Sequence, residues 1–223
     1  MAHERDKLAL KHLESMVADD IPGFKTKFKD QSKLHRGFGK LVKSWLRTAT
    51  TLFPNVWFPN DKRHVEDPRA AIAVLQHEWV HLKDAFTLFD KLPRALKWLN
   101  VIGWYKLYLL PQLLAVFALV APIAVLAGGS HVWWAFLAFA LLAAPLPAYF
   151  RMRSEVRGYQ RTRELGGNID QITKAFTGIV YFRMWPFKKY IKKELAKPSP
   201  YRDEMDKTVS KAYELADAEL GNV

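Results

Sequence analysis

The sequence predicts a mainly α fold with a small β-hairpin or sheet and a two-helix transmembrane hairpin. Apolar residues recur at helical spacing along most charged segments, one short segment is rich in β-branched and aromatic residues, and residues 107–150 contain no Asp, Glu, Lys or Arg. The 34 basic and 22 acidic residues, with a net charge of +12, therefore all lie outside this stretch. We expect four regions: a basic helical region at 1–45, a core with edge strands at 46–106, the transmembrane hairpin at 107–150 and a helical region at 151–223.

The N-terminal region is expected to hold two helices. Apolar residues between positions 8 and 17 recur at roughly helical spacing among charges, which predicts an amphipathic helix over residues 4–18. A second, basic helix is expected over residues 31–45. The beginning of the chain is charged and lacks the apolar core of a secretory signal peptide, so we expect the chain to start in the cytosol.

A β-hairpin and a long helix are expected next. β-Branched and aromatic residues flank Pro54-Asn55, which predicts strands near residues 46–53 and 56–58. Asp67 followed by Pro68 is typical of an N-cap and a first helical position. A helix is therefore expected from Pro68 to about Leu88.

The uncharged stretch is expected to form two membrane-spanning helices. Residues 107–126 and 131–150 are each long enough to cross the roughly 30 Å of hydrocarbon in a bilayer. Basic residues flank both ends of the stretch and none lies at its tip, so the positive-inside rule places both ends in the cytosol. This predicts an integral membrane protein with the lipid bilayer as a partner. The buried core of a helical domain is the alternative.

The last region returns to a charged composition, with helices expected at 154–165, 168–181 and 203–220. The chain has no cysteine, which excludes disulfides, cysteine nucleophiles and cysteine zinc ligands and leaves histidines and carboxylates as metal ligands. The positive net charge suits nucleic acid and an anionic membrane surface equally well. No nucleic-acid-binding motif accompanies the charge, so no nucleic-acid partner is expected.

The helix expected at 68–88 contains an HExxH motif, from His77 to His81. Histidines at i and i+4 stand one turn apart on one helix face, so both imidazoles reach a single Zn²⁺, while Glu78 points to a water on that metal. We therefore expect His77 and His81 as zinc ligands and Glu78 as the general base of a hydrolase. Two buried histidines without a metal, or a zinc-binding protein that hydrolyses nothing, are the alternatives.

A catalytic zinc site needs a third protein ligand. The pattern HExxHxxGxxH is excluded, because Asp84 stands at its glycine and Thr87 at its last ligand position. Glu155 begins a helix where the chain leaves the uncharged stretch, on the same side as the HExxH helix, and is the expected third ligand. Glu164, further along the same helix, is the alternative.

This order of features resembles the membrane gluzincin peptidases of the HtpX-like and prenyl-protein endopeptidase type, and the core resembles a minigluzincin. The resemblance covers roughly Thr48 to Gly166, although the family's usual ExxxD around the third ligand is ExxxY here, at Glu155 and Tyr159. It implies a zincin-like α+β core, an active site at the cytosolic membrane face and a peptide substrate bound alongside the edge strand. The expected localisation is integral membrane, with both termini and the active site cytosolic.

The expected function is that of a membrane-anchored zinc endopeptidase acting on a peptide or protein substrate. Zinc held by the three ligands activates a water, and Glu78 takes its proton and delivers it to the leaving amine. Tyr159 is a candidate for stabilising the oxyanion and Asp84 for orienting a ligand imidazole; packing and a solvated helix surface also explain these two residues. A non-catalytic membrane protein whose basic flanks bind lipid or nucleic acid, with or without structural zinc, is the competing function. The oligomeric state is not predicted.

Overall fold

The computed structural model describes residues 2–41, 43–60, 66–88, 92–93, 96–104, 122–123, 125–128, 146–177, 185 and 187–221. The chain divides into two compact units. The first contains Met1–Lys83, Arg157–Asn168 and Leu195–Val223, and the second contains Asp84–Val156 and Ile169–Glu194. Three helices run across the division and contribute residues to both units: α4 (Pro68–Thr87), α7 (Leu146–Glu164) and α9 (Lys188–Leu195).

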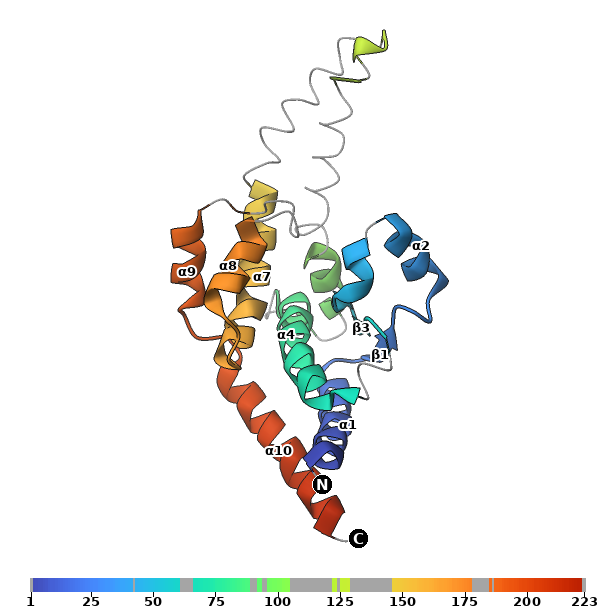
Figure 1. Cartoon of the computed structure of the whole chain (residues 1–223), viewed down its shortest axis with the longest axis vertical. Helices are drawn as coiled ribbons and strands as arrows, with labels where there is room; N and C mark the ends of the chain where they lie inside the picture. The colour runs from blue at the N-terminus through green and yellow to red at the C-terminus, as the bar shows by residue number, and fades with distance from the viewer. Residues whose placement is uncertain are drawn as a thin grey trace. The chain divides into compact units, whose positions relative to one another are not determined.

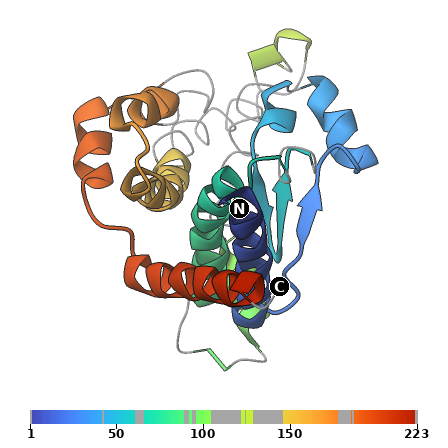
Figure 2. The same cartoon turned by 60° about the horizontal axis from the view of Figure 1, so that its bottom comes forward.

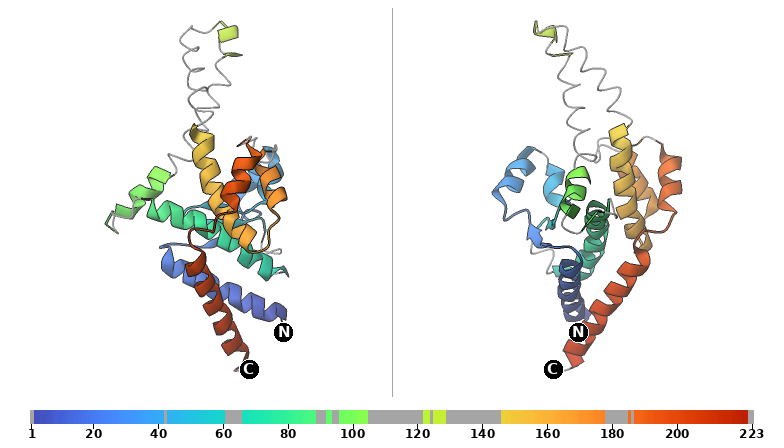
Figure 3. Two further views of the ribbon diagram at one scale, coloured as in Figure 1. Left: turned by 90° about the vertical axis from the view of Figure 1, so that its left-hand side faces the viewer. Right: turned by 180° about the vertical axis from the view of Figure 1, so that it is seen from behind.

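The two terminal helices pack against each other in the first unit. α1 (Ala2–Asp20) and α10 (Arg202–Gly221) lie side by side, with the two chain termini at the same end (Figures 1 and 3). Arg5 pairs with Asp217 at 2.6 Å, and the hydroxyl of Tyr213 donates to Asp6 at 2.9 Å. Small and branched apolar side chains fill the buried faces: Ala9, Leu10, Leu13 and Val17 on α1, and Met205, Ala212 and Ala216 on α10. The predicted helices over 4–18 and 203–220 are confirmed.

A three-stranded sheet lies next to α1 and α4 in the first unit (Figure 2). It consists of β1 (Thr26–Phe28), β2 (Thr50–Leu52) and β3 (Asn55–Phe58), in the order β1-β3-β2. β3 pairs with β1 in parallel and with β2 antiparallel. The predicted hairpin is confirmed as β2 and β3, although β2 is shorter than expected. Among the described residues no strand pairs with the other side of β2, so β2 is an edge strand.

The predicted helix over 31–45 is interrupted. α2 (Lys33–Leu41) is followed by a 3₁₀ helix, η1 (Lys43–Arg47), which leads into β2. The side chain of Lys29 is fully buried beside this segment, and its ammonium donates to the carbonyls of Trp45 and Thr48 at 2.9 and 2.8 Å and to Thr50 Oγ1 at 2.7 Å. It also lies 4.0 Å from the centre of the Trp45 ring. One buried cation therefore ties η1 to the edge strand.

Two long helices provide the motif residues. α4 (Pro68–Thr87) begins where the sequence predicts, because the Asp67 carboxylate accepts a hydrogen bond from Ala70 N at 3.0 Å, as an N-cap does. α7 (Leu146–Glu164) ends at Gly166, whose φ of 96° belongs to the left-handed region that favours glycine at a helix end. Its C-terminus is thus the predicted one, whereas its start lies eight residues earlier than the predicted Ser154.

The second unit contains the first part of α7 together with α8 (Ile169–Thr177) and all of α9 except its last residue, Leu195 (Figure 1). Lys192 on α9 pairs with Asp170 on α8 at 2.6 Å, and Arg153 on α7 pairs with Glu194 on α9 at 3.5 Å. α8 lies within the predicted helix over 168–181, whose last residues are outside the described part of the chain. α9 lies in a basic stretch for which no secondary structure was predicted from the sequence.

The transmembrane hairpin is the part of the predicted fold class that has to be corrected. Most of residues 107–150 lie outside the described residues, and no helix of the described part combines the length and apolar character needed to cross a bilayer. The described end of the stretch, residues 146–150, is the beginning of α7, which continues without a break into a segment rich in Arg and Glu. The fold class is therefore mainly α with a small three-stranded sheet. The predicted integral-membrane localisation depended on the hairpin and is corrected with it.

Candidate metal centre

α4 holds His77 and His81 one turn apart on the same face. Leu75, Val80 and Leu82 are in the core, and Trp79 Nε1 donates to the Asp20 carboxylate at 2.9 Å, so the motif turn is anchored on its other sides. The two Nε2 atoms of the histidines approach each other to 3.3 Å. The HExxH spacing thus brings the imidazoles together as the sequence predicts.

α7 contacts His77 in the first unit through two of its residues. A Cβ at Gly158 would lie 2.8 Å from both Cε1 and Nε2 of His77, so the absence of a side chain there lets the imidazole rest against the helix backbone. His77 Nδ1 lies 2.9 Å from Thr162 Oγ1, whose hydroxyl is directed to the Gly158 carbonyl at 3.5 Å. If a metal occupied Nε2, the imidazole proton would be on Nδ1, and Thr162 Oγ1 is placed to accept it.

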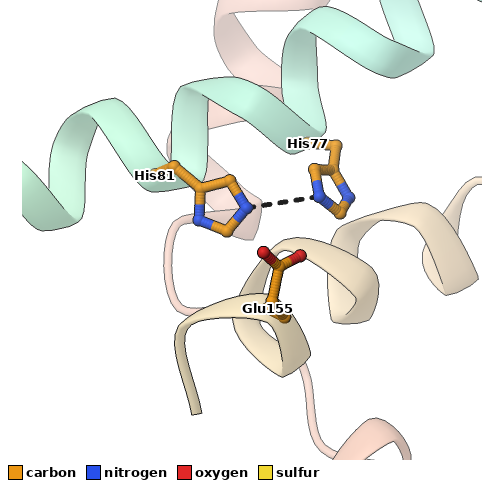
Figure 4. Close-up of side chains that lie close together, drawn as sticks. All are labelled: His77, His81 and Glu155. Carbon is orange, nitrogen blue, oxygen red and sulfur yellow. Dashed lines mark hydrogen bonds between the residues drawn. The ribbon is translucent and has the colours of Figure 1, made fainter. Parts of the chain in front are cut away.

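Glu155 completes the cluster from the same helix. It lies one turn before Gly158 on α7, and this continuous helix joins it to the contacts that Gly158 and Thr162 make with His77. Ligand atoms of His77, His81 and Glu155 all lie within 4.8 Å of one another. In Figure 4 both imidazoles, on α4, face the Glu155 carboxylate, on α7. Glu155 is 8% exposed, and a carboxylate so buried needs a cationic or hydrogen-bonding environment.

The donor set fits a zinc ion. Two nitrogens at 2.0–2.1 Å from a tetrahedral metal lie roughly 3.3 Å apart, which is the separation of the two Nε2 atoms. Without a metal, the same separation allows a hydrogen bond between the two imidazoles (Figure 4). Two imidazoles and one carboxylate are also the ligands of known catalytic zinc sites, which keep a fourth position for water.

Glu164, the alternative third ligand, has a different role in the structure. Its carboxylate accepts from the backbone N–H of Ser199 at 2.8 Å and pairs with Arg161 at 3.3 Å. The buried Arg161 guanidinium also donates to the side chain of Gln76, next to His77 on α4, and to Asp206 on α10 at 2.5 Å. Glu164 therefore belongs to the polar group that joins α4, α7 and α10, and Glu155 is the glutamate brought to the histidines.

The side chain of Glu78 is held against the sheet. Its Oε2 accepts a hydrogen bond of 2.6 Å from Thr51 Oγ1 on β2, and both side chains are buried. Lys29 interacts electrostatically with Glu78: its pKa is lowered to about 8 mainly by burial, and attraction to Glu78 partly opposes this shift. The candidate general base thus lies between the HExxH helix and the edge strand.

The two residues with proposed supporting roles are also located. The Tyr159 ring lies edge-on to the His77 ring, with centroids 4.7 Å apart and an interplanar angle of 77°, so it contributes to the packing around the ligand. Asp84 lies one turn beyond His81 and is half-buried. A hydrogen bond joins His77 Nδ1 and Thr162 Oγ1 on the other ligand-bearing helix. The predicted roles of Tyr159 and Asp84 remain predictions.

Sequence reasoning missed Thr51, Gly158 and Thr162. Thr51 lies in a short Thr-Thr-Leu strand, and nothing local shows which of its residues faces the helix. Gly158 and Thr162 follow Glu155 at spacings of three and seven, which places them along one face of α7. That helical spacing is the signal that would have found them.

Comparison with known proteins yields no relative: no protein-family model matches the chain, and no curated protein or solved structure matches it either. The resemblance to gluzincins therefore depends on the motif and on the geometry of the cluster.

Proposed function

We propose that the protein is a zinc-dependent endopeptidase with a gluzincin-like site. The observation that carries this proposal is the convergence of His77, His81 and Glu155 within 4.8 Å. A carboxylate that follows the first histidine, Glu78, lies outside this ligand set and is held by the edge strand. A structural zinc site would occupy four protein ligands, whereas the three ligands that converge among the described residues, with an adjacent carboxylate, are typical of hydrolysis.

The residues of the chain have distinct roles in the proposed reaction. His77, His81 and Glu155 would hold the zinc ion, which would supply Lewis-acid polarisation of the scissile carbonyl and a water of lowered pKa. The Glu78 carboxylate accepts the proton of the attacking water and then delivers it to the nitrogen of the leaving amine. Thr162 holds His77 in the tautomer that presents Nε2. The Tyr159 hydroxyl is the candidate donor to the oxyanion.

A peptide substrate is expected to bind in an extended conformation along β2. The N–H of Val56 donates to the Lys25 carbonyl on the β1 side at 3.3 Å, so the polar backbone groups of Val56 point away from β2. Thr51 is paired with Val56, and in an antiparallel ladder its own N–H and carbonyl therefore point to the open edge. Strand addition there gives backbone recognition with little dependence on substrate sequence.

Cleavage of fluorescein-labelled casein tests the proposal. The wild-type protein is expected to cleave casein, to lose activity with 1,10-phenanthroline and to regain it with added Zn²⁺. Glu78→Gln should keep the bound zinc and lose roughly 10²–10⁴-fold in rate, because it removes general acid–base catalysis without removing a ligand.

Two outcomes count against this function. Casein cleavage that survives complete removal of zinc, or that is unchanged in Glu78→Gln, excludes the proposed mechanism. Stoichiometric zinc without turnover of casein indicates the non-catalytic zinc protein.

A further inference from the structure

We propose that Thr51 is a positioning residue for Glu78: the hydrogen bond from its hydroxyl fixes the direction of the general base at the metal centre. This inference rests on the proposed function, because it assigns a role in that reaction to a residue of the sheet.

The geometry of the contact is that of a strong hydrogen bond. Thr51 Oγ1 and Glu78 Oε2 are 2.6 Å apart, within the range of a hydroxyl donating to a carboxylate. Thr51 is 8% exposed and Glu78 is 7% exposed, so water competes little for either group. The second contact of the hydroxyl, with the Glu78 carbonyl at 3.3 Å, is longer and secondary.

Thr51 carries a hydroxyl at a position of β2 where an apolar side chain would be expected. Side chains alternate across a strand, and Thr51 is the residue of β2 that faces inward, while Thr50 and Leu52 are half-buried on the other face. Its partner across the ladder is Val56, which is fully buried. Valine has the same shape as threonine and suits such an environment, so the hydrogen bond to Glu78 is what the hydroxyl adds.

The same contact constrains the carboxylate. A glutamate has three side-chain torsions, and a bond to Oε2 sets the plane of the carboxylate and with it the direction of Oε1. Lys29 attracts Glu78 electrostatically, but its ammonium donates its hydrogen bonds to Trp45, Thr48 and Thr50. Thr51 therefore supplies a directional contact to the carboxylate. Proton transfer requires such orientation, because a base must lie within hydrogen-bond reach of the proton it takes.

Thr51→Val tests the inference, with Thr51→Ser as the conservative variant and Thr26→Val as the matched control. Thr26 lies in the same sheet, and its hydroxyl also donates to a carboxylate, that of Glu14 at 2.5 Å, in the first unit but outside the metal centre. The measurements are kcat and KM for fluorescein-labelled casein and the zinc content of each variant.

The expected result is specific to a positioning role. Thr51→Val should lower kcat about tenfold, with KM changed less than twofold and zinc content unchanged, because only the orientation of the base is lost. Thr51→Ser should restore kcat to within about twofold of the wild type, and Thr26→Val should leave kcat unaltered.

The failures are distinguishable. Wild-type kcat in Thr51→Val, an equal loss in Thr26→Val, or loss of zinc from Thr51→Val overturns the positioning role and leaves the proposed function standing. A wild-type protein that binds no zinc or cleaves no casein contradicts the proposed function itself, and the inference falls with it.

Discussion

At the scale of single residues, the metal centre depends on how α7 receives the imidazole of His77. Gly158 leaves room for the ring, and Thr162 Oγ1 is hydrogen-bonded to its Nδ1. Both contacts act on the same ligand from the same helix, three and seven residues after Glu155. The face of α7 that provides the third ligand therefore also sets the orientation of the first.

Gly158→Ala is expected to separate folding from metal binding. The added Cβ would meet the His77 ring at 2.8 Å, and since the ring is the movable partner, it turns away while the helices stay in place. Zinc affinity should fall roughly 10–100-fold, the usual effect of disturbing a ligand's support. The thermal midpoint should stay the same or rise, because alanine favours a helix over glycine by about 0.5–1 kcal/mol.

Competition titration with a chromophoric zinc chelator measures this affinity. Gly37→Ala is the control, because Gly37 is also helical and a Cβ there meets nothing within 4 Å. Unchanged zinc affinity in Gly158→Ala would show that the close packing of Gly158 against His77 does not matter for the site.

At the scale of elements, the edge strand β2 is tied to η1 by the buried ammonium of Lys29. Burial of this charge lowers the free energy of unfolding. The pKa of Lys29 falls from 10.5 to about 8, chiefly by burial, so the folded state binds this proton less tightly than the unfolded state does. The full cost of the buried charge is present below about pH 8 and decreases as the pH rises toward 10.5. Titration of Lys29 should therefore make the protein more stable across this interval.

The pH dependence of urea unfolding checks this expectation. The free energy of unfolding of the wild type, minus that of Lys29→Met, should increase between pH 8 and pH 10.5, because the variant lacks the titrating group. In Lys27→Met, a substitution on β1, Lys29 is retained and the wild-type rise should persist. A wild-type minus Lys29→Met difference that is constant with pH would contradict the assigned shift.

The elements that the sequence predicts well are those whose signals are local. The Asp67-Pro68 start of α4 and the Gly166-Gly167 end of α7 follow from backbone chemistry at those residues, and both are confirmed. β1 was missed because three residues with no alternating pattern form a strand only through pairing with the distant β3. The break between α2 and η1 was missed because Lys29, an apparently ordinary cation, bonds to η1 and β2.

At the scale of the whole molecule, the predicted fold class was wrong in its transmembrane hairpin. The prediction took the limits of the uncharged stretch as the limits of membrane-spanning helices. Residues 146–150 are uncharged, yet they begin the helix that continues through Arg151 to Glu164, since a helix is maintained by its own backbone bonds whatever its side chains. The described end of the second expected span therefore belongs to α7, and no helix of the described part could span a membrane.

The approach of Glu155 to His77 and His81 was expected from the transmembrane hairpin, which was predicted to return the chain to the side of the motif; the cluster is present although the described part of the chain has no spanning helix. Thr51 is different: its partnership with Glu78 depends on strand register and on the packing of β2 against α4. Such contacts between distant segments depend on tertiary structure, so they cannot be predicted from short-range sequence patterns.

The most direct test of the zinc centre is the zinc content of the purified protein after dialysis against a zinc buffer, compared among the wild type, Glu155→Gln and Glu164→Gln. The wild type and Glu164→Gln should hold one zinc per chain, because Glu164 bonds to Ser199 and Arg161 rather than to the metal. Glu155→Gln should lose at least the roughly 10–100-fold in affinity that disturbing a supporting residue causes. Zinc absent from the wild type, or retained in Glu155→Gln and lost in Glu164→Gln, would contradict the assignment of His77, His81 and Glu155 as a metal centre.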